Sequence, residues 1–287
     1  MATPAAAPPR ITVIVAAFNA AGTLQRCIDS VAAQTYAAKE LVVIDGASTD
    51  GSVDILRANR ESIDVWVSEP DRGIYDAWNK GVARARGEWI CFCGADDYLH
   101  GPRALETISR HLIGAPPAQR IVYGRVLVVD ANGREIESLG MPWASARERF
   151  MRGTYCLPTE GILFRSILFR ERGYFDDSFS IAGDYEFLLR ELKHSEPQFV
   201  PEVVLVDMQY GGISSRPEST LISLREMRAA HAKHGLPYFN PHYFVALLRV
   251  RLRLLIWRIL GERQARRALD FGRRLLGKQP YWTKIKT

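Results

Sequence analysis

The stretch Ile11–Phe18, "ITVIVAAF", is a nearly continuous run of apolar and β-branched residues. Such a run is typical of a strand that is buried on both faces, as in a parallel sheet covered by helices. A helical pattern follows over Leu24–Gln34, and Thr23 can cap its first turn. The apolar side chains of this helix share one face, formed by Leu24, Cys27, Ile28 and Val31. A buried strand followed by an amphipathic helix indicates an α/β fold.

The alternation of strand and helix continues through the first hundred residues. Further apolar runs are "ELVVIDG" (Glu40–Gly46), "IDVWVSE" (Ile63–Glu69) and "EWICFC" (Glu88–Cys93), with helical patterns over Val53–Asn59 and Gly73–Ala85 between them. Asp50 or Ser52 can cap the first of these helices. The second is expected to pack through Ile74, Ala77, Trp78, Gly81 and Val82. Repeated βαβ units predict a mostly parallel, Rossmann-like sheet with helices on both faces.

Polar residues follow the apolar runs at the point where each strand should end. They are Asn19, Asp45, Asp71 and the pair Asp96–Asp97. In open parallel sheets, ligands bind outside the carboxyl ends of the strands. We therefore expect these side chains to converge on one edge of the sheet and to form the ligand site.

The pair Asp96–Asp97 lies in "GADDYL" (Gly94–Leu99), directly after an apolar run. Adjacent carboxylates repel each other and are costly to bury without a cation. Carboxylate oxygens suit Mg²⁺ or Mn²⁺, which can bridge a diphosphate and neutralise its charge. Neither GxxxxGK[ST] nor GxGxxG follows the first strand, which disfavours P-loop enzymes and most dinucleotide-binding enzymes. A nucleotide would then be held by carboxylates and a metal ion.

The second half of the chain departs from the βαβ rhythm. Alternation on both sides of "DANG" (Asp130–Gly133) predicts a hairpin with Asn132 and Gly133 at its turn. A helix is expected in "IAGDYEFLLRELKHS" (Ile181–Ser195), and another in "PESTLISLREMRAAHAKHG" (Pro217–Gly235). On the latter, His231 and His234 are interpreted as surface residues rather than metal ligands.

Composition and charge narrow the possible partners. The 287 residues are 47% hydrophobic and 24% charged, as in ordinary globular proteins. Four cysteines without a disulfide pattern are expected to be buried thiols in a reducing compartment, and the N-terminus lacks the features of a signal peptide. Residues 241–287 hold twelve Lys/Arg and two Asp/Glu, a net charge of about +10. Subtracting this from the net charge of +6 for the whole chain leaves residues 1–240 with a net charge of about −4. This charge argues against a nucleic-acid-binding main domain.

The basic C-terminal segment is helix-like, apolar and rich in arginine. Four arginines in its most apolar part disfavour a membrane-spanning helix. On a continuous helical wheel one group of arginines clusters, namely Arg249, Arg253, Arg263, Arg267 and Arg274, with Arg251 and Arg258 nearly opposite. We expect an amphipathic helix on an anionic membrane surface, with Trp257 at the interface. The alternative is a solvated helix that packs back on the catalytic domain.

Several motifs occur together in the order known from one enzyme family. They are "VIVAAFN", "ELVVIDGASTDGS", "DRGIYDAWNKG", "ARGEWICFCGADDYL" and "AGDYEFLLREL". Over Pro9–Gly212 the chain resembles the inverting glycosyltransferases of family 2, in the branch that builds bacterial surface polysaccharides and glycolipids. The resemblance implies a GT-A fold and a hexosyltransferase-like enzyme that is cytoplasmic or peripheral on the inner face of the membrane. It implies a disordered tail over 1–9, a catalytic domain over 10–240 and a helical tail over 241–287. Within the catalytic domain, 10–100 would bind the nucleotide sugar and 101–240 the glycan or lipid-linked acceptor.

The resemblance also implies roles for individual residues. Asp45 would contact the base or ribose, Asp96 the ribose or donor, and Asp97 the metal ion, Mn²⁺ or Mg²⁺. Asp184 would be the catalytic base that removes the proton of the acceptor hydroxyl. The remaining donor-binding residues would be Ala16, Ala17, Phe18 and Asn19 at the nucleobase, with Asp71, Arg72 and Lys80 at the diphosphate.

Two residues depart from the family pattern. Gly46 stands where many relatives have a second aspartate, and Gly183 stands where an acidic residue precedes the catalytic aspartate. Glu186 is then a candidate for tuning the pKa of Asp184. Without the resemblance, Asp184 would be interpreted as a first-turn acid that the helix dipole stabilises. A metal-dependent nucleotidyltransferase and a catalytically silent nucleotide-binding membrane module remain as alternative functions.

Overall fold

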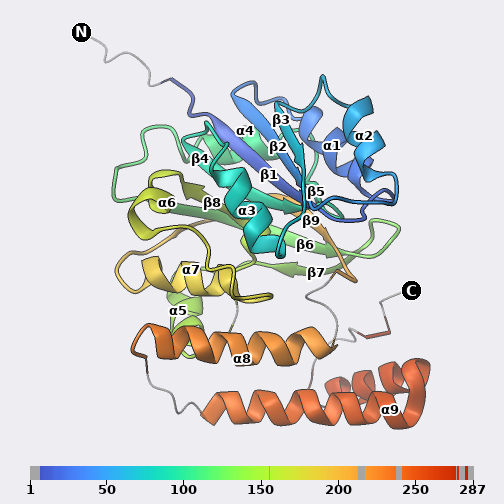
Figure 1. The fold of residues 1–287 in the computed structure, drawn as a ribbon. Coiled ribbons are helices and arrows are strands. Elements are labelled where there is room, and N and C mark those ends of the chain that lie inside the picture. Colours follow the sequence, from blue (N-terminus) through green and yellow to red (C-terminus); the bar gives the residue numbers. More distant parts are fainter. Residues whose placement is uncertain are drawn as a thin grey trace.

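The computed structural model describes residues 7–154, 156–212, 217–236, 241–275, 277 and 282–283. The strands of these regions join one nine-stranded sheet in the order β3-β2-β1-β4-β8-β6-β9-β5, with β7 paired to β6 (Figure 1). The strands are β1 (Ile11–Ala17), β2 (Lys39–Asp45), β3 (Val65–Ser68), β4 (Trp89–Gly94), β5 (Tyr98–Leu99), β6 (Ile121–Val129), β7 (Glu135–Leu139), β8 (Ile162–Arg165) and β9 (Gln198–Gln209).

Helices connect and cover these strands. They are α1 (Leu24–Ala32), α2 (Ser52–Ala58), α3 (Ile74–Val82), α4 (Ala104–Ser109), α5 (Trp143–Met151), α6 (Ile167–Arg172), α7 (Gly183–Leu192), α8 (Pro217–Lys233) and α9 (Pro241–Leu275), with a 3₁₀ turn, η1 (Thr159–Gly161), before β8.

The first half of the sheet has the predicted parallel βαβ arrangement. Strand β1 pairs in parallel with both β2 and β4, and β2 pairs in parallel with β3. Helix α1 buries the predicted face, formed by Leu24, Cys27, Ile28 and Val31. Cys27, Cys91 and Cys93 are free, buried thiols, as expected. The apolar strand positions that point away from α1 pack on α3 and α7 instead, so both faces of the sheet are covered.

The second half of the sheet is mixed. Strand β8 runs antiparallel to β4 and β6, whereas β6 and β9 are parallel. The predicted hairpin is confirmed by the antiparallel pair β6–β7, and Gly133 at its turn has φ 75°. Leu99 of β5 pairs with Val206 of β9. The proposed division near residue 100 therefore falls inside a continuous sheet.

Aromatic side chains build the core on the α3 and α7 side. Phe92 of β4 lies 4.6 Å from Trp78 and 5.2 Å from Phe175, measured between ring centroids. Phe187 of α7 stacks on Phe169 at 4.8 Å. This cluster joins the two halves of the chain, because its members come from both.

Some local predictions are wrong. Ile74 is 36% exposed, and its neighbour Tyr75 is buried instead. The helix starts also differ, since Thr23 makes no side-chain capping bond and the N-cap of α2 is Gly51. Asp50 nevertheless bonds the start of α2, because its Oδ1 accepts the Ser52 N–H at 3.0 Å, while its Oδ2 accepts the N–H of Ala21 at 2.9 Å.

Order near the N-terminus begins earlier than expected. Residues 1–6 of the predicted disordered tail lie outside the described residues, but Pro9 is buried. Its carbonyl accepts a hydrogen bond of 2.6 Å from the hydroxyl of Tyr36. Residue 9 is therefore part of the packed structure rather than of a disordered tail.

The C-terminal helix α9 lies outermost, beneath α8 and on the far side of the molecule from the parallel strands (Figure 1). It breaks at Gly261, where φ is 68° and ψ is 168°, so one continuous helical wheel does not apply to the predicted arginine cluster. Trp257, the residue expected at a membrane interface, packs edge-on against Trp282, with the ring centroids 5.4 Å apart. Among the described helices, none is long and apolar enough to cross a membrane.

Candidate active site

The polar residues that follow the strands do converge on one edge of the sheet. The parallel register places Ala17 beside Asp45, and Asp45 beside Ser68. Ala16 lies beside Gly94, the last residue before the "ADD" segment. The carboxyl ends of β1, β2, β3 and β4 are thus neighbours, as the sequence predicts for a ligand-binding edge.

The loops after β1 and β2 are bonded to each other. Asn19 has a positive φ of 49°, and its N–H donates to Ser48 Oγ at 2.7 Å. In return, the Thr49 N–H donates to Asn19 Oδ1 at 3.0 Å. This exchange holds the β1 loop open, and Phe18 presents its ring to solvent with 66% exposure. Ala17 is buried beneath it and Ala16 half-buried. An exposed ring above a fixed backbone is suited to stacking a flat ligand.

Asp45 is fully buried at the end of β2 and organises the same loop. Its Oδ1 accepts the Ser48 hydroxyl at 2.5 Å, and its Oδ2 accepts the Ser68 hydroxyl at 2.6 Å. The Ser48 N–H also donates to Oδ2, at 3.0 Å. Because neutral donors from the loop after β2 and from the end of β3 satisfy this carboxylate, Asp45 fixes the shape of the loop even where it does not touch a ligand.

The departure at Gly46 has a physical reason. A Cβ atom at residue 46 would lie 2.5 Å from Asp71 Oδ2 and 3.2 Å from the ring of Phe18. The carboxylate of Asp71 therefore occupies the space beside Gly46. Phe18, Gly46 and Asp71 come from three separate loops and meet at this point. The sequence predicts Phe18 and Asp71 as part of the site and shows Gly46 as a departure from the family pattern. It does not predict that the carboxylate of Asp71 lies where many relatives have the carboxylate of a second aspartate.

Arg72 and Lys80 lie at the start and end of α3, within a cluster of acids. Arg72 pairs with Asp76 at 3.0 Å and with Asp177. Lys80 donates to the Pro70 carbonyl at 2.7 Å and pairs with Asp76 at 3.4 Å. Both cations are engaged with protein groups here, so a diphosphate would have to compete with these acids for them.

The acids after β4 differ from each other in burial. Asp97 is only 5% exposed, and its Oδ1 accepts the Gln209 N–H at 2.8 Å, whereas Asp96 is half-buried. The backbone around them is fixed by Arg26, which donates to the Asp96 carbonyl at 3.1 Å and lies over the Tyr98 ring. Burial, then the charges of Asp96 and Glu160, raise the pKa of Asp97 well above its usual value.

Glu160 is the main site residue that the sequence analysis missed. It sits in η1, and burial followed by the charges of Asp184 and Asp96 raises its pKa to about 7. Glu160 is therefore coupled electrostatically to Asp96, after β4, and to Asp184, at the start of α7. In the sequence, "PTEG" (Pro158–Gly161) shows neither strand nor helix periodicity, and a lone glutamate in it carries no signal.

Three carboxylates therefore crowd together at this edge: Asp96, Asp97 and Glu160. Their oxygen donors are those that Mg²⁺ and Mn²⁺ prefer, and the raised pKa values of Asp97 and Glu160 mark an unneutralised negative charge. The donor chemistry fits a hard divalent cation. Among the residues that the structure describes, no group of three or more His, Cys, Asp or Glu is arranged so that it could hold a metal ion.

Asp184 lies in the first turn of α7 and is held by two hydroxyl groups. The Thr159 hydroxyl donates to its Oδ2 at 2.6 Å, and the Tyr75 hydroxyl lies 3.1 Å from its Oδ1. Burial, then the charge of Asp184, raise the pKa of Tyr75 well above its usual value, which keeps its proton in place. A Cβ at Gly183 would come within 2.8 Å of the Tyr75 ring, so glycine at 183 lets this ring reach Asp184.

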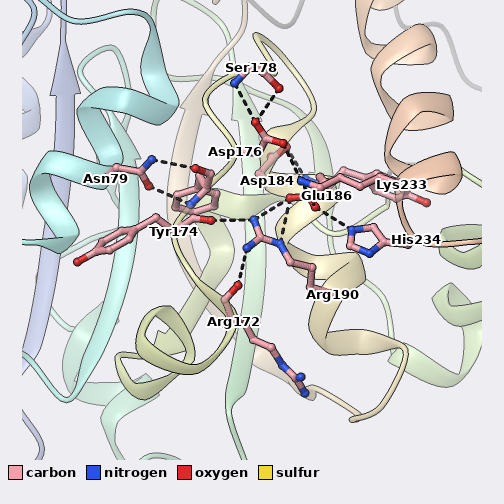
Figure 2. Close-up of polar contacts among 12 residues, drawn as sticks. Asn79, Arg172, Tyr174, Asp176, Ser178, Asp184, Glu186, Arg190, Lys233 and His234 are labelled. Atoms are coloured by element: carbon pink, nitrogen blue, oxygen red, sulfur yellow. Dashed lines mark hydrogen bonds and ion pairs between the residues drawn. The ribbon is translucent and has the colours of Figure 1, made fainter.

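Glu186, the residue expected to tune Asp184, has its own set of charged partners. Glu186 is fully buried and belongs to a separate ion cluster (Figure 2). Its carboxylate accepts Arg190 at 2.7 Å and His234 at 2.7 Å, and it pairs with Lys233 at 3.1 Å. These contacts tie α7 to α8. Glu160 is an acid whose pKa the charge of Asp184 raises.

The histidines of α8 are not surface residues. His231 is 6% exposed, and its Nε2 lies 2.6 Å from the hydroxyl of Tyr185, which also donates to the Phe150 carbonyl at 2.7 Å. His234 bonds to Glu186, as described above. The i and i+3 positions share a helix face, and that face packs on α7. The sequence showed the shared face but not which element covers it.

Comparisons with known proteins agree with this architecture. The profile described as "Glycosyl transferase family 2" matches residues 12–179. The chain is 32% identical over 230 residues to an uncharacterized glycosyltransferase of Mycobacterium tuberculosis, which covers 79% of this chain and 86% of that protein. It is 30% identical over 218 residues to the PGL/p-HBAD biosynthesis glycosyltransferase of Mycobacterium bovis, covering 73% and 80%.

Solved structures share the fold. A mannosyltransferase from Pyrobaculum calidifontis, in complex with GDP-Man and Mn²⁺, has a TM-score of 0.62 at 21% identity and covers 98% of this chain and 86% of its own. S. aureus TarS 1–349 in complex with UDP-GlcNAc has a TM-score of 0.60 at 18% identity and covers 84% and 71%. These likenesses confirm the predicted fold class.

Proposed function

This chain belongs to glycosyl transferase family 2, is a glycosyltransferase with a GT-A type fold, and from that premise we propose its reaction. It moves a sugar from a nucleoside diphosphate to a hydroxyl of a glycan or lipid-linked acceptor, with inversion at the anomeric carbon. The observation that carries the proposal is the placement of Asp184. This carboxylate is held by Thr159 and Tyr75 and couples through Glu160 to the acids after β4.

The donor would bind across the carboxyl edge of the sheet. Phe18 would stack on the nucleobase, above a pocket floor made by Ala16, Ala17 and Asn19. The Gly46 loop, shaped by Asp45, and the Asp71 carboxylate beside it would read polar groups of the base or ribose, because both flank the Phe18 ring. Asp96 would contact the ribose. Arg72 and Lys80 would approach the diphosphate after exchanging their present partners.

Mn²⁺ or Mg²⁺ would be held by Asp97 in partnership with the diphosphate of the donor. When bound, the cation supplies positive charge that stabilises the departing diphosphate. Asp97 is suited to the role because it is buried beside two further carboxylates, Asp96 and Glu160, whose charges raise its pKa. The Mn²⁺ complex of the archaeal mannosyltransferase supports the same choice of ion.

Asp184 would act as the general base. Its carboxylate removes the proton from the acceptor hydroxyl as that oxygen forms a bond to the anomeric carbon. The bond between this carbon and the diphosphate oxygen breaks on the opposite face, and the nucleoside diphosphate leaves with the electron pair. The proton ends on Asp184. The hydroxyls of Thr159 and Tyr75 hold the carboxylate in one orientation, which lowers the entropic cost of reaching a reactive geometry.

The acceptor is proposed to be a glycan or a lipid-linked glycan of the cell surface. The PGL/p-HBAD biosynthesis glycosyltransferase of Mycobacterium bovis supports a role in glycolipid or polysaccharide biosynthesis. A lipid-linked acceptor would place the enzyme on the inner face of the cytoplasmic membrane, in contact with it through the C-terminal tail.

Hydrolysis of a panel of nucleotide sugars, with Mn²⁺ or with a chelator, tests this function. We expect one UDP-, GDP- or dTDP-sugar to be turned over only with the metal and to raise Tm by about 5–10 °C at saturation. Conversion of the nucleotide sugar with added pyrophosphate into a nucleoside triphosphate and a sugar 1-phosphate would indicate a nucleotidyltransferase instead. Binding without turnover, with every acceptor class tried, would favour the silent module.

The role of Asp184 is tested by Asp184→Asn. Transfer should fall by at least roughly a thousandfold, because the amide cannot accept the proton. Donor-induced stabilisation should persist, since Asp184 does not contact the nucleotide in this proposal. Asp54→Asn, an exposed acid in the first turn of α2, is the matched control and should transfer normally. Near-normal transfer by Asp184→Asn would reject this residue as the base.

A further inference from the structure

The first segment of α9, residues 241–260, presents two apolar faces. One face packs on α8, where Val250 is 8% exposed and Tyr243, Ala246 and Leu254 pack against the core. The other face is exposed to solvent. Its exposed side chains are Phe244 at 50%, Val245 at 46%, Leu248 at 68%, Leu252 at 53%, Leu255 at 52% and Ile259 at 69%.

The exposed apolar side chains of this face form a single stripe. Leu248, Leu252, Leu255 and Ile259 follow one another at intervals of four, three and four residues, which places them on one side of a helix. From Phe244 to Ile259 the stripe is about 22 Å long. Figure 1 shows α9 as the outermost element, with α8 between it and the sheet. The stripe is turned away from the protein because the opposite side of α9 packs on α8.

Arginines border the stripe on both sides. Arg251 and Arg258 lie along one border and Arg249 along the other, and all three are exposed. Residues 241–261 contain no Asp or Glu. Within the described part of the chain, no carboxylate forms an ion pair with these three arginines. The stripe is therefore apolar in its centre and purely cationic at its edges.

We propose that this stripe lies in the interfacial region of a bilayer rich in anionic lipid. An in-plane helix buries its apolar side chains at the level of the acyl boundary, and arginines at its borders reach the phosphates. A second copy of the chain fits less well. Face-to-face packing of two stripes would bring rows of arginine together without any acid to separate them. The proposal rests on the peripheral location suggested above but not on the proposed chemistry.

The structure thus changes which residues of the tail are expected to touch the membrane. The sequence pattern suggested a broad basic helix with Trp257 at the interface. In the structure, Trp257 is on the packed side with Trp282, and the break at Gly261 separates the second segment from the stripe. Binding is assigned to the six apolar residues and to Arg249, Arg251 and Arg258.

Flotation of the full chain with vesicles tests the proposal. The chain should float with vesicles of about 70% phosphatidylcholine and about 30% phosphatidylglycerol. It should float only weakly with vesicles of pure phosphatidylcholine. The triple variant Leu248→Ser, Leu255→Ser, Ile259→Ser should lose about 100-fold in partitioning, because three inserted side chains are removed. Its matched control, Ile113→Ser with Tyr174→Ser, removes exposed apolar groups elsewhere and should float normally.

The charges are tested separately. Arg249→Gln, Arg251→Gln and Arg258→Gln together should weaken binding to anionic vesicles by about 100-fold and leave the weak binding to neutral vesicles unchanged. The control is Arg57→Gln, Arg110→Gln and Arg134→Gln, which removes the same charge from other surfaces. Equal losses in both sets would mean that net charge, not the border of the stripe, attracts the membrane, and would overturn the proposal.

Two further outcomes would overturn it. The wild-type chain could fail to float with anionic vesicles, or the apolar triple variant could float as well as wild type. A solution mass of twice 32.3 kDa that the apolar variant halves would assign the stripe to a second copy. Donor hydrolysis without vesicles is measured on every preparation. Normal hydrolysis alongside lost flotation separates the membrane surface from the proposed function.

Discussion

Two buried carboxylates at opposite ends of the parallel strands show how differently this fold treats negative charge. Glu40, at the start of β2, is 1% exposed and accepts the Thr12 hydroxyl at 2.5 Å and Arg86 Nε at 2.7 Å. Burial alone would raise its pKa, but the bonds from Thr12 and Arg86 hold the pKa below its usual value. Asp97, at the other end, is 5% exposed, and its pKa is raised well above the usual value.

The difference lies in the partners that the protein supplies. Glu40 receives a cation and a hydroxyl, so the amino end of the sheet is complete in itself. Asp97 receives backbone hydrogen bonds from Gln209 and Gly94 and has two acids as neighbours, Asp96 and Glu160. Arg26, an arginine at that edge, is bonded to the Gln209 side chain and to the Asp96 carbonyl. A carboxylate with a protein partner stabilises the fold, whereas one without a partner is available to a cation from outside.

The largest expected effect is that of Asp97→Asn. Transfer should fall by roughly a thousandfold or more, because the buried ligand that holds the diphosphate-bound metal is lost. The unliganded protein should become more stable, by about 1 kcal/mol, since the amide removes repulsion from Asp96 and Glu160. Turnover and Tm in the absence of metal measure the two effects. A less stable variant would contradict the view that this end carries unneutralised charge.

Glu40→Gln should have the opposite pattern. We expect a loss of about 2–3 kcal/mol in the free energy of unfolding, because the charge-assisted bonds with Arg86 are broken inside the protein. The donor KM and the rate of transfer should stay close to wild type, as the two ends of the strands are separated by the length of the sheet. Denaturant titration and steady-state kinetics test this. Lost activity at unchanged stability would show that the two ends are not independent.

The pH dependence of stability should also differ in sign. Glu160 has a raised pKa of about 7, so the folded protein without metal binds a proton that the unfolded chain releases near the usual value of 4.5. Its unfolding free energy should therefore fall as pH rises from 4.5 to 7, by about 1–3 kcal/mol. Glu40 has a lowered pKa, and its contribution is lost only as pH falls below that of the unfolded glutamate.

Unfolding at several pH values with a chelator, on wild type and Glu160→Gln, measures the first of these slopes. The unfolding free energy of the variant should depend less on pH between about pH 5 and pH 7, which is the range set by the raised pKa of Glu160. Addition of Mn²⁺ and nucleoside diphosphate should flatten the wild-type curve as well, because bound cation replaces the proton. A slope that survives in the variant would have to come from another group.

The same contrast explains what the sequence could predict. The carboxyl edge was visible because parallel register follows from apolar periodicity, and Asn19, Asp45 and the Asp96–Asp97 pair end their strands. The buried face of α1 followed from spacing alone. Glu160 and Thr159 were not visible, because they stand in a 3₁₀ turn whose place depends on the antiparallel strand β8.

Choices between neighbours were also beyond the sequence. Tyr75 is buried and Ile74 exposed because the Tyr75 hydroxyl finds Asp184 and the Ile181 carbonyl across the molecule. His231 is buried for a similar reason, since it reaches Tyr185. Hydrophobic periodicity predicts which positions of an element are buried from local sequence alone. It cannot show a polar partner 46 residues away, as for Tyr185 and His231, or 109 residues away, as for Tyr75 and Asp184.

The smallest effect is expected from Gly46→Ala, and it tests whether the donor edge is fixed by shape as well as by charge. The new Cβ would lie 2.5 Å from Asp71 Oδ2, so this carboxylate must turn away from Phe18. The carboxylate ends a flexible side chain, and stability should change by less than about 1 kcal/mol. The donor KM should rise about three- to tenfold, equivalent to one displaced polar contact. Gly22→Ala, with nothing within 4 Å of its Cβ, is the matched control and should leave the KM unchanged. If Gly46→Ala binds donor normally, the Asp71 carboxylate does not read the nucleotide, and recognition at this end depends on the metal-binding acids and the Phe18 ring.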